Sequence, residues 1–123
     1  MPNPTLLFYE AGEPLWAQRL RQVCAIQGVR LRSVTNSDLG RTVLALSEGD
    51  ETGPTQPFAP LPESMLVICH LSGPHLDRLL KSLRKAGVPR TCLKAVLTAE
   101  NAKWPLHTLW EELVQERAAL DPK

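Results

Sequence analysis

The feature that most constrains the fold of this chain is that its two halves repeat one pattern of apolar and turn residues. In the first half, the apolar run 6–9 is followed by a helical pattern, a strand-like segment at 29–34 and a short helical pattern. The same order recurs from the apolar run 65–69, with the second strand-like segment at 92–98. The sequence therefore predicts two βαβα units, an internal repeat of about sixty residues.

We expect the two units at about residues 4–46 and 64–120, in a single domain that spans residues 1–123, because this length suits one ordinary domain. Segment 47–63 between them contains four prolines, two glycines and several acidic residues. Such a composition is typical of a partly polyproline-like linker. A passive tether is favoured over a functional flap, since proline-rich acidic segments rarely bury a surface.

The order of the strands is predicted from their charge patterns. The first strand of each unit is continuously apolar, which is typical of a strand buried on both faces. The second strands carry charges, namely Arg30, Arg32 and Lys94, which suit the edges of a sheet. We therefore predict an α/β fold with a four-stranded, mostly parallel, doubly wound sheet in the order 2-1-3-4 and helices on both faces. The alternative is an antiparallel central pair in a two-layer fold, with all the helices on one face.

Composition narrows the class of protein. The formal net charge is +1, and apolar residues make up 43% of the chain, as in ordinary globular proteins. The three cysteines are an odd number without a C-x-x-C motif, which favours a reducing, cytoplasmic location over a secreted disulfide scaffold. No apolar run is long enough for a signal peptide or a membrane span. We expect no cofactor and no metal.

A ligand site is predicted from the fold. Ligands of open parallel sheets bind where the strand order reverses, at the carboxyl ends of the central strands. The candidate ligand-binding residues at that point are Glu10, Gly12, His70, Ser72, Gly73 and His75. The second of the two loops opens a helix, whose free amides favour an anion. The simpler interpretation, which is favoured, is that Ser72 or Gly73 caps this helix, Pro74 takes an early position and His75 is solvated.

Metal binding and thiol catalysis are disfavoured by the spacing of the candidate residues. Cys69 and His70 are neighbours at the end of a strand, so their side chains point to opposite faces and do not readily share one ion. The one further histidine of the sequence is His107, on the expected last helix. Neither a set of zinc ligands nor a nucleophile with its base is evident.

The region between His75 and Lys103 contains seven Lys or Arg side chains and only two acidic ones. Four of these cations lie on the third helix, namely Arg78, Lys81, Arg84 and Lys85. Such a face can bind phosphates of a nucleic acid. However, the chain has few aromatic residues for stacking with bases, so a simply solvated helix face is favoured.

The block 93–104, Leu-Lys-Ala-Val-Leu-Thr-Ala-Glu-Asn-Ala-Lys-Trp, is the most specific motif, together with Gly-Val-Pro-Arg at 87–90 before it. It resembles the signature of an uncharacterised bacterial family of small proteins with the core L-K-A-V-x-T-x-x-N-x-x-W. The resemblance covers about Met65–Arg117. It identifies relatives and implies no activity.

Two interpretations of this block remain open. Lys94, Thr98, Asn101 and Trp104 could form an interaction surface. Alternatively, Trp104 packs on the last helix as a hydrophobic staple, and Thr98 and Asn101 tie the turn together through side-chain hydrogen bonds, which is favoured.

The function itself is predicted only as a class. The leading expectation is a small noncatalytic interaction or regulatory module with an unknown protein partner. The first alternative is a domain that binds a small anionic ligand or a phosphate at the crevice described above. Binding of nucleic acid through the basic third helix is the second alternative and the less favoured one.

Overall fold

The structure is a computed structural model and describes residues 3–12, 14–49, 60–89 and 92–120. Its elements in chain order are β1 (Thr5–Tyr9), α1 (Ala17–Ile26), β2 (Arg30–Val34), η1 (Asn36–Asp38), α2 (Val43–Ser47), β3 (Met65–Cys69), α3 (Gly73–Lys85), β4 (Leu93–Val96), η2 (Asn101–Lys103) and α4 (Leu106–Leu120). The order of elements is thus the same in each half, namely strand, helix, strand, 3-10 turn and helix. Most of the predicted linker 47–63 lies outside the described residues.

The predicted strand order is confirmed, because the sheet has the order β2-β1-β3-β4. The sheet is mostly parallel: β1 pairs with β2, and β3 pairs with β4, in parallel. The central pair differs from the parallel one that we favoured. Strands β1 and β3 are antiparallel, with Leu7 opposite Val67 and Tyr9 opposite Met65.

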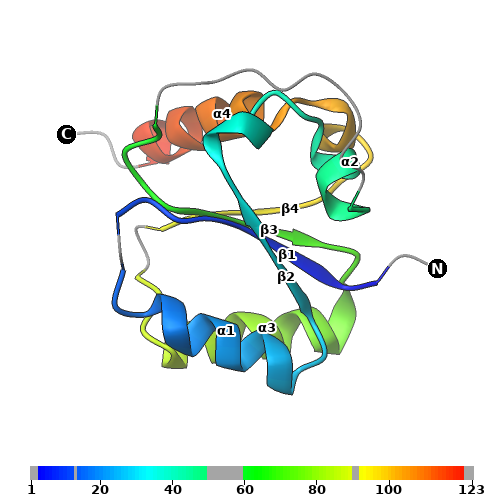
Figure 1. The fold of residues 1–123 in the computed structure, drawn as a ribbon, viewed down its shortest axis with the longest axis vertical. Helices are drawn as coiled ribbons and strands as arrows, with labels where there is room; N and C mark the ends of the chain where they lie inside the picture. The colour runs from blue at the N-terminus through cyan, green and yellow to red at the C-terminus, as the bar shows by residue number, and fades with distance from the viewer. Residues whose placement is uncertain (1–2, 13, 50–59, 90–91, 121–123) are drawn as a thin grey trace.

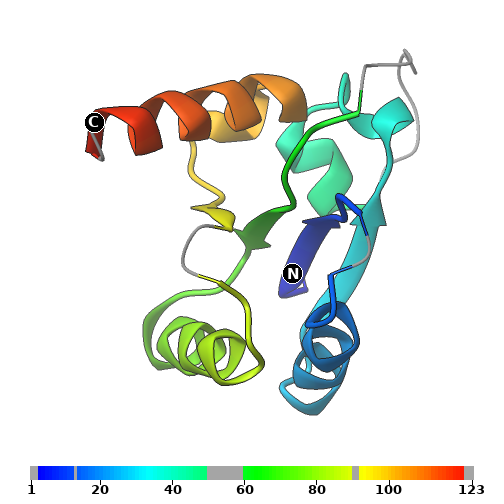
Figure 2. The same cartoon turned by 90° about the vertical axis from the view of Figure 1, so that its left-hand side faces the viewer.

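Helices nevertheless cover both faces, as predicted for the doubly wound sheet. Figures 1 and 2 show α1 and α3 on one face and α2 and α4 on the other. A right-handed crossover from β1 to β2 fixes the face on which α1 lies. Because β3 runs opposite to β1 and its crossover proceeds toward the other edge, the same handedness places α3 on the face of α1. The antiparallel alternative was therefore right about the central pair and wrong about the single layer of helices.

The two central strands are buried on both faces, which explains their continuously apolar sequences. Leu6, Phe8, Leu66 and Ile68 belong to the core between the sheet and the α1/α3 layer. The alternate residues of both strands, among them Leu7 and Val67, belong to the core under the α2/α4 layer. Hydrophobic burial on both faces is the main source of stability for such strands.

The starts of α2 and α4 are joined by reciprocal backbone hydrogen bonds. The Val43 N–H donates to the Trp104 carbonyl over 3.0 Å, and the Leu106 N–H donates to the Arg41 carbonyl over 2.9 Å. Thr42 and Pro105 form an antiparallel bridge between these bonds. The second helix of one half is thus attached to the second helix of the other. Within the described part of the chain, no helix has the length and apolarity needed to cross a bilayer.

Candidate functional site

The structure does not bring the six predicted ligand-binding residues together. Because β1 and β3 are antiparallel, their carboxyl ends lie at opposite ends of the sheet. The loop after β1 approaches the start of β3, where the Ala11 N–H donates to Ser64 Oγ over 3.0 Å. His70, after β3, instead follows the residue paired with Thr5 at the start of β1. The single crevice expected from a parallel central pair is therefore not formed.

Glu10 and Gly12 line a hollow of about 440 Å³ at the carboxyl ends of β1 and β2. Several of the polar groups around it already have partners in the protein. The Glu10 carboxylate lies 3.4 Å from the Arg21 guanidinium. The Tyr9 hydroxyl donates to the Asn36 side chain and accepts from the Leu61 N–H over 2.9 Å. This hollow has polar walls, but its side chains are used to hold the loops in place.

His70 has an unusual backbone conformation for a residue other than glycine, with φ at 61°. Its Nε2 lies 3.1 Å from the Ser47 hydroxyl, which donates to the Leu44 carbonyl over 2.7 Å. The Ser47 oxygen must therefore accept from a protonated Nε2 of His70. Left-handed backbone is costly for most L-residues but tolerated by Asn, Asp and His. His70 thus connects the end of β3 to α2.

The other three candidate residues of this loop lie at the start of α3. Ser72 precedes α3 in an extended conformation, but its side chain makes no capping hydrogen bond. Gly73 has φ at 61°, and Pro74 occupies the first turn of the helix, as expected. His75 is not a fully solvated residue, because its Nε2 lies 3.1 Å from the Gln27 carbonyl and the side chain is half-buried. It ties the start of α3 to the end of α1.

Thr98 and Asn101 close the turn after β4, as the favoured interpretation predicted. The Thr98 N–H donates to Asn101 Oδ1 over 2.8 Å, and the Asn101 N–H donates to Thr98 Oγ1 over 3.1 Å. Asn101 Nδ2 also donates to the Val96 carbonyl over 3.1 Å. Because Asn101 is buried, this side chain replaces hydrogen bonds to water and fixes the turn.

Trp104 and Lys94, the other two residues of the candidate interaction surface, lie on different sides of the sheet. Trp104 is half-buried and packs against the α2/α4 core that contains Leu106 and Leu109. Lys94 pairs in register with Leu66, on the α1/α3 side, and its Nζ donates to the carbonyls of Pro89 and Cys92. The four residues therefore do not form one continuous surface.

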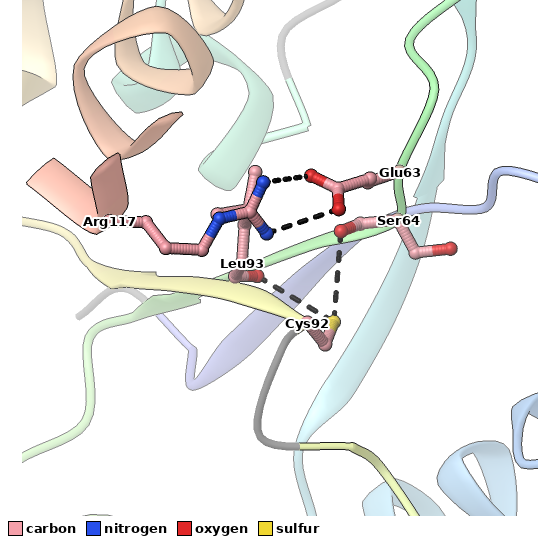
Figure 3. A network of polar contacts seen from close by, with 5 residues as sticks. All are labelled: Glu63, Ser64, Cys92, Leu93 and Arg117. Carbon is pink, nitrogen blue, oxygen red and sulfur yellow. Dashed lines mark hydrogen bonds and ion pairs between the residues drawn. The ribbon is translucent and has the colours of Figure 1, made fainter. Parts of the chain in front are cut away.

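The cysteines are placed as packing residues. Burial raises the pKa of Cys24 to about 11 and that of Cys69 to about 12. Burial also raises the pKa of Cys92, while the nearby Lys94 charge lowers it. Figure 3 shows Cys92 close to the bidentate ion pair of Glu63 and Arg117, with its thiol directed toward the backbone carbonyl of Ser64.

A raised pKa keeps a thiol protonated and weakly nucleophilic at neutral pH. The described residues also contain no group of three His, Cys, Asp or Glu side chains arranged to hold a metal ion.

A hollow that the sequence did not predict lies between the edge strand β2 and α2, with a volume of about 420 Å³. Its charged lining residues are Arg30, Arg32, Asp38 and Arg41. Arg30 and Arg32 were expected on β2 because charged side chains suit the edge of a sheet. Their alternation also directs both of them to the α2 side, because Leu31 between them packs in the α1/α3 core. The Arg-x-Arg pattern of β2, followed by further polar residues, is the feature of the sequence that could have indicated this hollow.

The second charged region is the exposed face of α3. Arg78, Lys81, Arg84 and Lys85 are all exposed, and among the described residues none of them forms an ion pair. Beside this face, a hollow of about 170 Å³ is lined by Leu80, Arg84, Val88 and Lys94. Apolar and cationic side chains therefore meet between α3 and the edge strand β4.

The geometry defines a small α/β protein in which two strand-helix-strand-helix halves share one sheet. Residues 64–120, which comprise β3 through α4, match the model of a family described as Domain of unknown function (DUF3783). The resemblance to an uncharacterised family, expected over about Met65–Arg117, is thereby confirmed for the C-terminal half. No curated protein and no solved structure matches the chain.

Proposed function

We propose that this protein is a small noncatalytic interaction module of the cytosol, and that its C-terminal half binds an acidic segment of a protein partner. The observation that carries the proposal is the row of exposed cations on α3 next to an open sheet edge. The three free thiols support a reducing compartment. The family block itself supports a structural role, since its Thr98 and Asn101 hold a turn.

The α3 face has the charge that an acidic partner needs. Arg78, Lys81, Arg84 and Lys85 project from one helix, on which Asp77 is the one acidic residue. Complementary charge accelerates association and selects the partner, although each exposed pair adds little affinity. Several such pairs along one helix act together.

The hollow between α3 and β4 adds an apolar contact to this charge. Leu80 and Val88 form its apolar part, and Arg84 and Lys94 flank them. The Lys94 ammonium is held at 3.2 Å from the Pro89 carbonyl, so its position is fixed before a partner arrives. Val96, at the end of β4, is 39% exposed. A segment that combines carboxylates with an apolar side chain matches this arrangement.

A protein partner is favoured over a nucleic acid because of where the aromatic rings lie. Binders of single strands stack bases on exposed aromatic side chains next to their cations. Trp104 and Trp110 pack in the α2/α4 core, on the other side of the sheet from α3. Trp16, on the α3 side near Gly87, is half-buried and packs against Phe8 with ring centroids 5.6 Å apart, so it is engaged with the core rather than exposed beside the cations.

The test compares the binding of two probes by fluorescence anisotropy. One is a labelled peptide in which glutamate alternates with leucine, and the other is single-stranded DNA of equal net charge. We expect the peptide to bind more tightly than the DNA. The double variant Lys81→Glu, Arg84→Glu is expected to lower the affinity for the peptide by about tenfold or more, because two attractive contacts become repulsive.

The matched control is Arg21→Glu, Lys103→Glu, which makes the same change in net charge at two exposed positions, one on the side of α1 that faces Glu10 and the other in η2. This control is expected to leave peptide binding within about twofold, since exposed charges beyond about 10 Å are largely screened. Equal losses in the two double variants, or no peptide binding at all, would exclude the α3 site. Tighter binding of the DNA, with a steep dependence on salt, would indicate a nucleic-acid partner instead.

A further inference from the structure

The two halves of the chain can be compared position by position. Leu7 lies opposite Val67 at the centre of the antiparallel pair, and Thr42 bridges Pro105. The hydrogen bonds around this bridge are reciprocal, as described above. In the sheet, Arg30 pairs with Thr5 and Leu93 pairs with Met65, each at the start of its parallel pair. The corresponding residues are 63 positions apart in both cases: Arg30 and Leu93 in the second strand, and Thr42 and Pro105 before the second helix.

The turns after β2 and β4 agree with this comparison. The Thr35 N–H donates to Asp38 Oδ2 over 3.0 Å, and the Thr98 N–H donates to Asn101 Oδ1 over 2.8 Å. In both halves, a threonine N–H thus donates to the side chain three residues later. Asp38 is the counterpart of Asn101, and Arg41 is the counterpart of Trp104.

The two halves differ sharply in what fills the space beside the second strand. In the C-terminal half, Trp104 and Trp110 pack against the apolar core together with Leu93. The counterparts in the N-terminal half are Arg41, Ser47 and Arg30, and these three line the hollow of about 420 Å³. The N-terminal half therefore has an open, polar space where the C-terminal half has two indole rings.

We infer that this hollow between β2 and α2 is a binding site for a small oxyanion, a phosphate or carboxylate group carried by a small molecule. Its volume is within the range of small-molecule sites. Among the described residues, three guanidinium groups and one carboxylate, that of Asp38, line it. Guanidinium groups offer paired N–H donors that match the oxygens of phosphate and carboxylate.

Asp38 offsets only one of these three positive charges, that of Arg41, and both of its oxygens are already engaged by the protein. One of them accepts from the Thr35 backbone, and the other lies 3.5 Å from Arg41 Nε. The Arg41 side chain is only 9% exposed, so Asp38 holds it in the wall of the hollow. Arg30 and Arg32 then remain as the two cations on the strand that can approach a ligand.

Arg32 is directed inward rather than into solvent. It is half-buried, and its Nη1 lies 3.5 Å from the position that a Cβ at Gly49 would take. Gly49 has φ at 76°, in the region that favours glycine. The chain after α2 can therefore turn closely past the guanidinium. Ser47 is part of the opposite wall. Its hydroxyl accepts a hydrogen bond from His70 and donates one to the Leu44 carbonyl, so its position is fixed.

The test is a backbone amide chemical-shift titration of the whole protein with three separate probes: inorganic phosphate, adenosine monophosphate and citrate. We expect saturable shifts at Arg30–Val34, Ser47 and Gly49 with at least one probe. A response to the first two assigns a phosphate ligand, whereas a response to citrate alone assigns a carboxylate ligand. Shifts confined to α3, or no saturable shift with any probe, would refute the site.

Two variants and one control make the assignment specific. Arg32→Gln and Arg30→Gln are each expected to weaken binding by about tenfold or more, since a charge-assisted hydrogen bond is lost. Arg30 is exposed, so this second variant does not depend on a core position. Arg19→Gln, an exposed arginine on α1, is expected to bind as the wild type does. Equal affinity in all three variants would overturn the inference.

This site is independent of the proposed function. It lies on the N-terminal half and on the α2 side of the sheet, whereas the acidic segment is proposed to bind at α3 and β4. The variant Lys81→Glu, Arg84→Glu is accordingly expected to bind the anion unchanged. Each proposal can thus fail while the other holds.

Discussion

Arg41 and Trp104 each accept, through the backbone carbonyl, a hydrogen bond from the helix that follows the other. The Trp104 carbonyl accepts from Val43 at the start of α2, and the Arg41 carbonyl accepts from Leu106 at the start of α4. The two residues are equivalent in the backbone and opposite in side-chain chemistry. One packs an indole ring against the core, and the other places a guanidinium in the wall of a hollow.

Replacing Asn101 by alanine is expected to destabilise the protein by about 2–3 kcal/mol. The change leaves the Thr98 N–H and the Val96 carbonyl without the buried side chain of Asn101, and each lost hydrogen bond costs about 1 kcal/mol or more. Urea denaturation measures the free energy of unfolding. The exposed neighbour Glu100→Ala is the control and should have little effect. A stable Asn101→Ala protein that loses a partner would instead support the interaction surface.

The order of the strands could be predicted from the sequence because burial leaves a clear pattern. Strands β1 and β3 are buried on both faces and are apolar throughout, whereas β2 carries Arg30 and Arg32 at an edge. The direction of the central pair could not be predicted in this way. A strand buried on both faces has the same composition whether its neighbour is parallel or antiparallel, and the ladder hydrogen bonds involve only the backbone.

The candidate site was predicted less well, for a related reason. Glu10 and His70 were expected in one crevice because that expectation depended on a parallel central pair, and the antiparallel pair separates them. The hollow beside Arg32 was missed because an arginine on an edge strand is already explained by its effect against aggregation of sheet edges. Only the comparison with the indole rings at Trp104 and Trp110 shows that the space beside it is left open.

The variant His70→Gly is expected to be more stable than His70→Val. His70→Gly relieves the left-handed backbone but loses the bond to Ser47, so these effects nearly cancel. His70→Val loses the bond and places a β-branched residue at a φ that it strongly disfavours, at a cost of about 2–3 kcal/mol. Urea denaturation of the two variants tests this. If the valine variant were the more stable, the left-handed conformation would be wrong.

The buried thiols are expected to make the protein less stable in alkali. The pKa of Cys24 is raised from 9.0 to about 11, and that of Cys69 from 9.0 to about 12. Below pH 9 the thiols are protonated in both states and stability is unaffected. Above it, the unfolded thiols ionise first, so the free energy of unfolding falls as the pH rises from about 9 toward 12.

The matched control is the double variant Cys24→Ala, Cys69→Ala, in which this part of the pH dependence is absent. Its absolute stability is lower, because two core side chains are smaller, so the slopes with pH are compared rather than the values. The same thiols should react with a thiol reagent in the native protein far more slowly than after unfolding. Identical slopes in the two proteins, or rapid native labelling at both positions, would contradict the burial of these side chains.

A chain of residues 60–123 alone is expected to form a two-fold symmetric dimer. Without the N-terminal half, β3 exposes an apolar edge that β1 otherwise covers, and such edges readily pair with another strand. A second copy can supply the same antiparallel contact, with Val67 facing Val67 of the other copy where it faces Leu7 in the full chain. Pro105 would likewise face Pro105 across the bridge that Thr42 now makes.

Sedimentation of the chain of residues 60–123 should report twice the mass of the single chain, whereas the full protein, with this edge already paired, should remain monomeric. Val67→Lys brings two charges together on the axis and should abolish the dimer. A folded monomer of residues 60–123 would show that one half is stable without a partner and that the symmetric arrangement of the full chain is not required for folding.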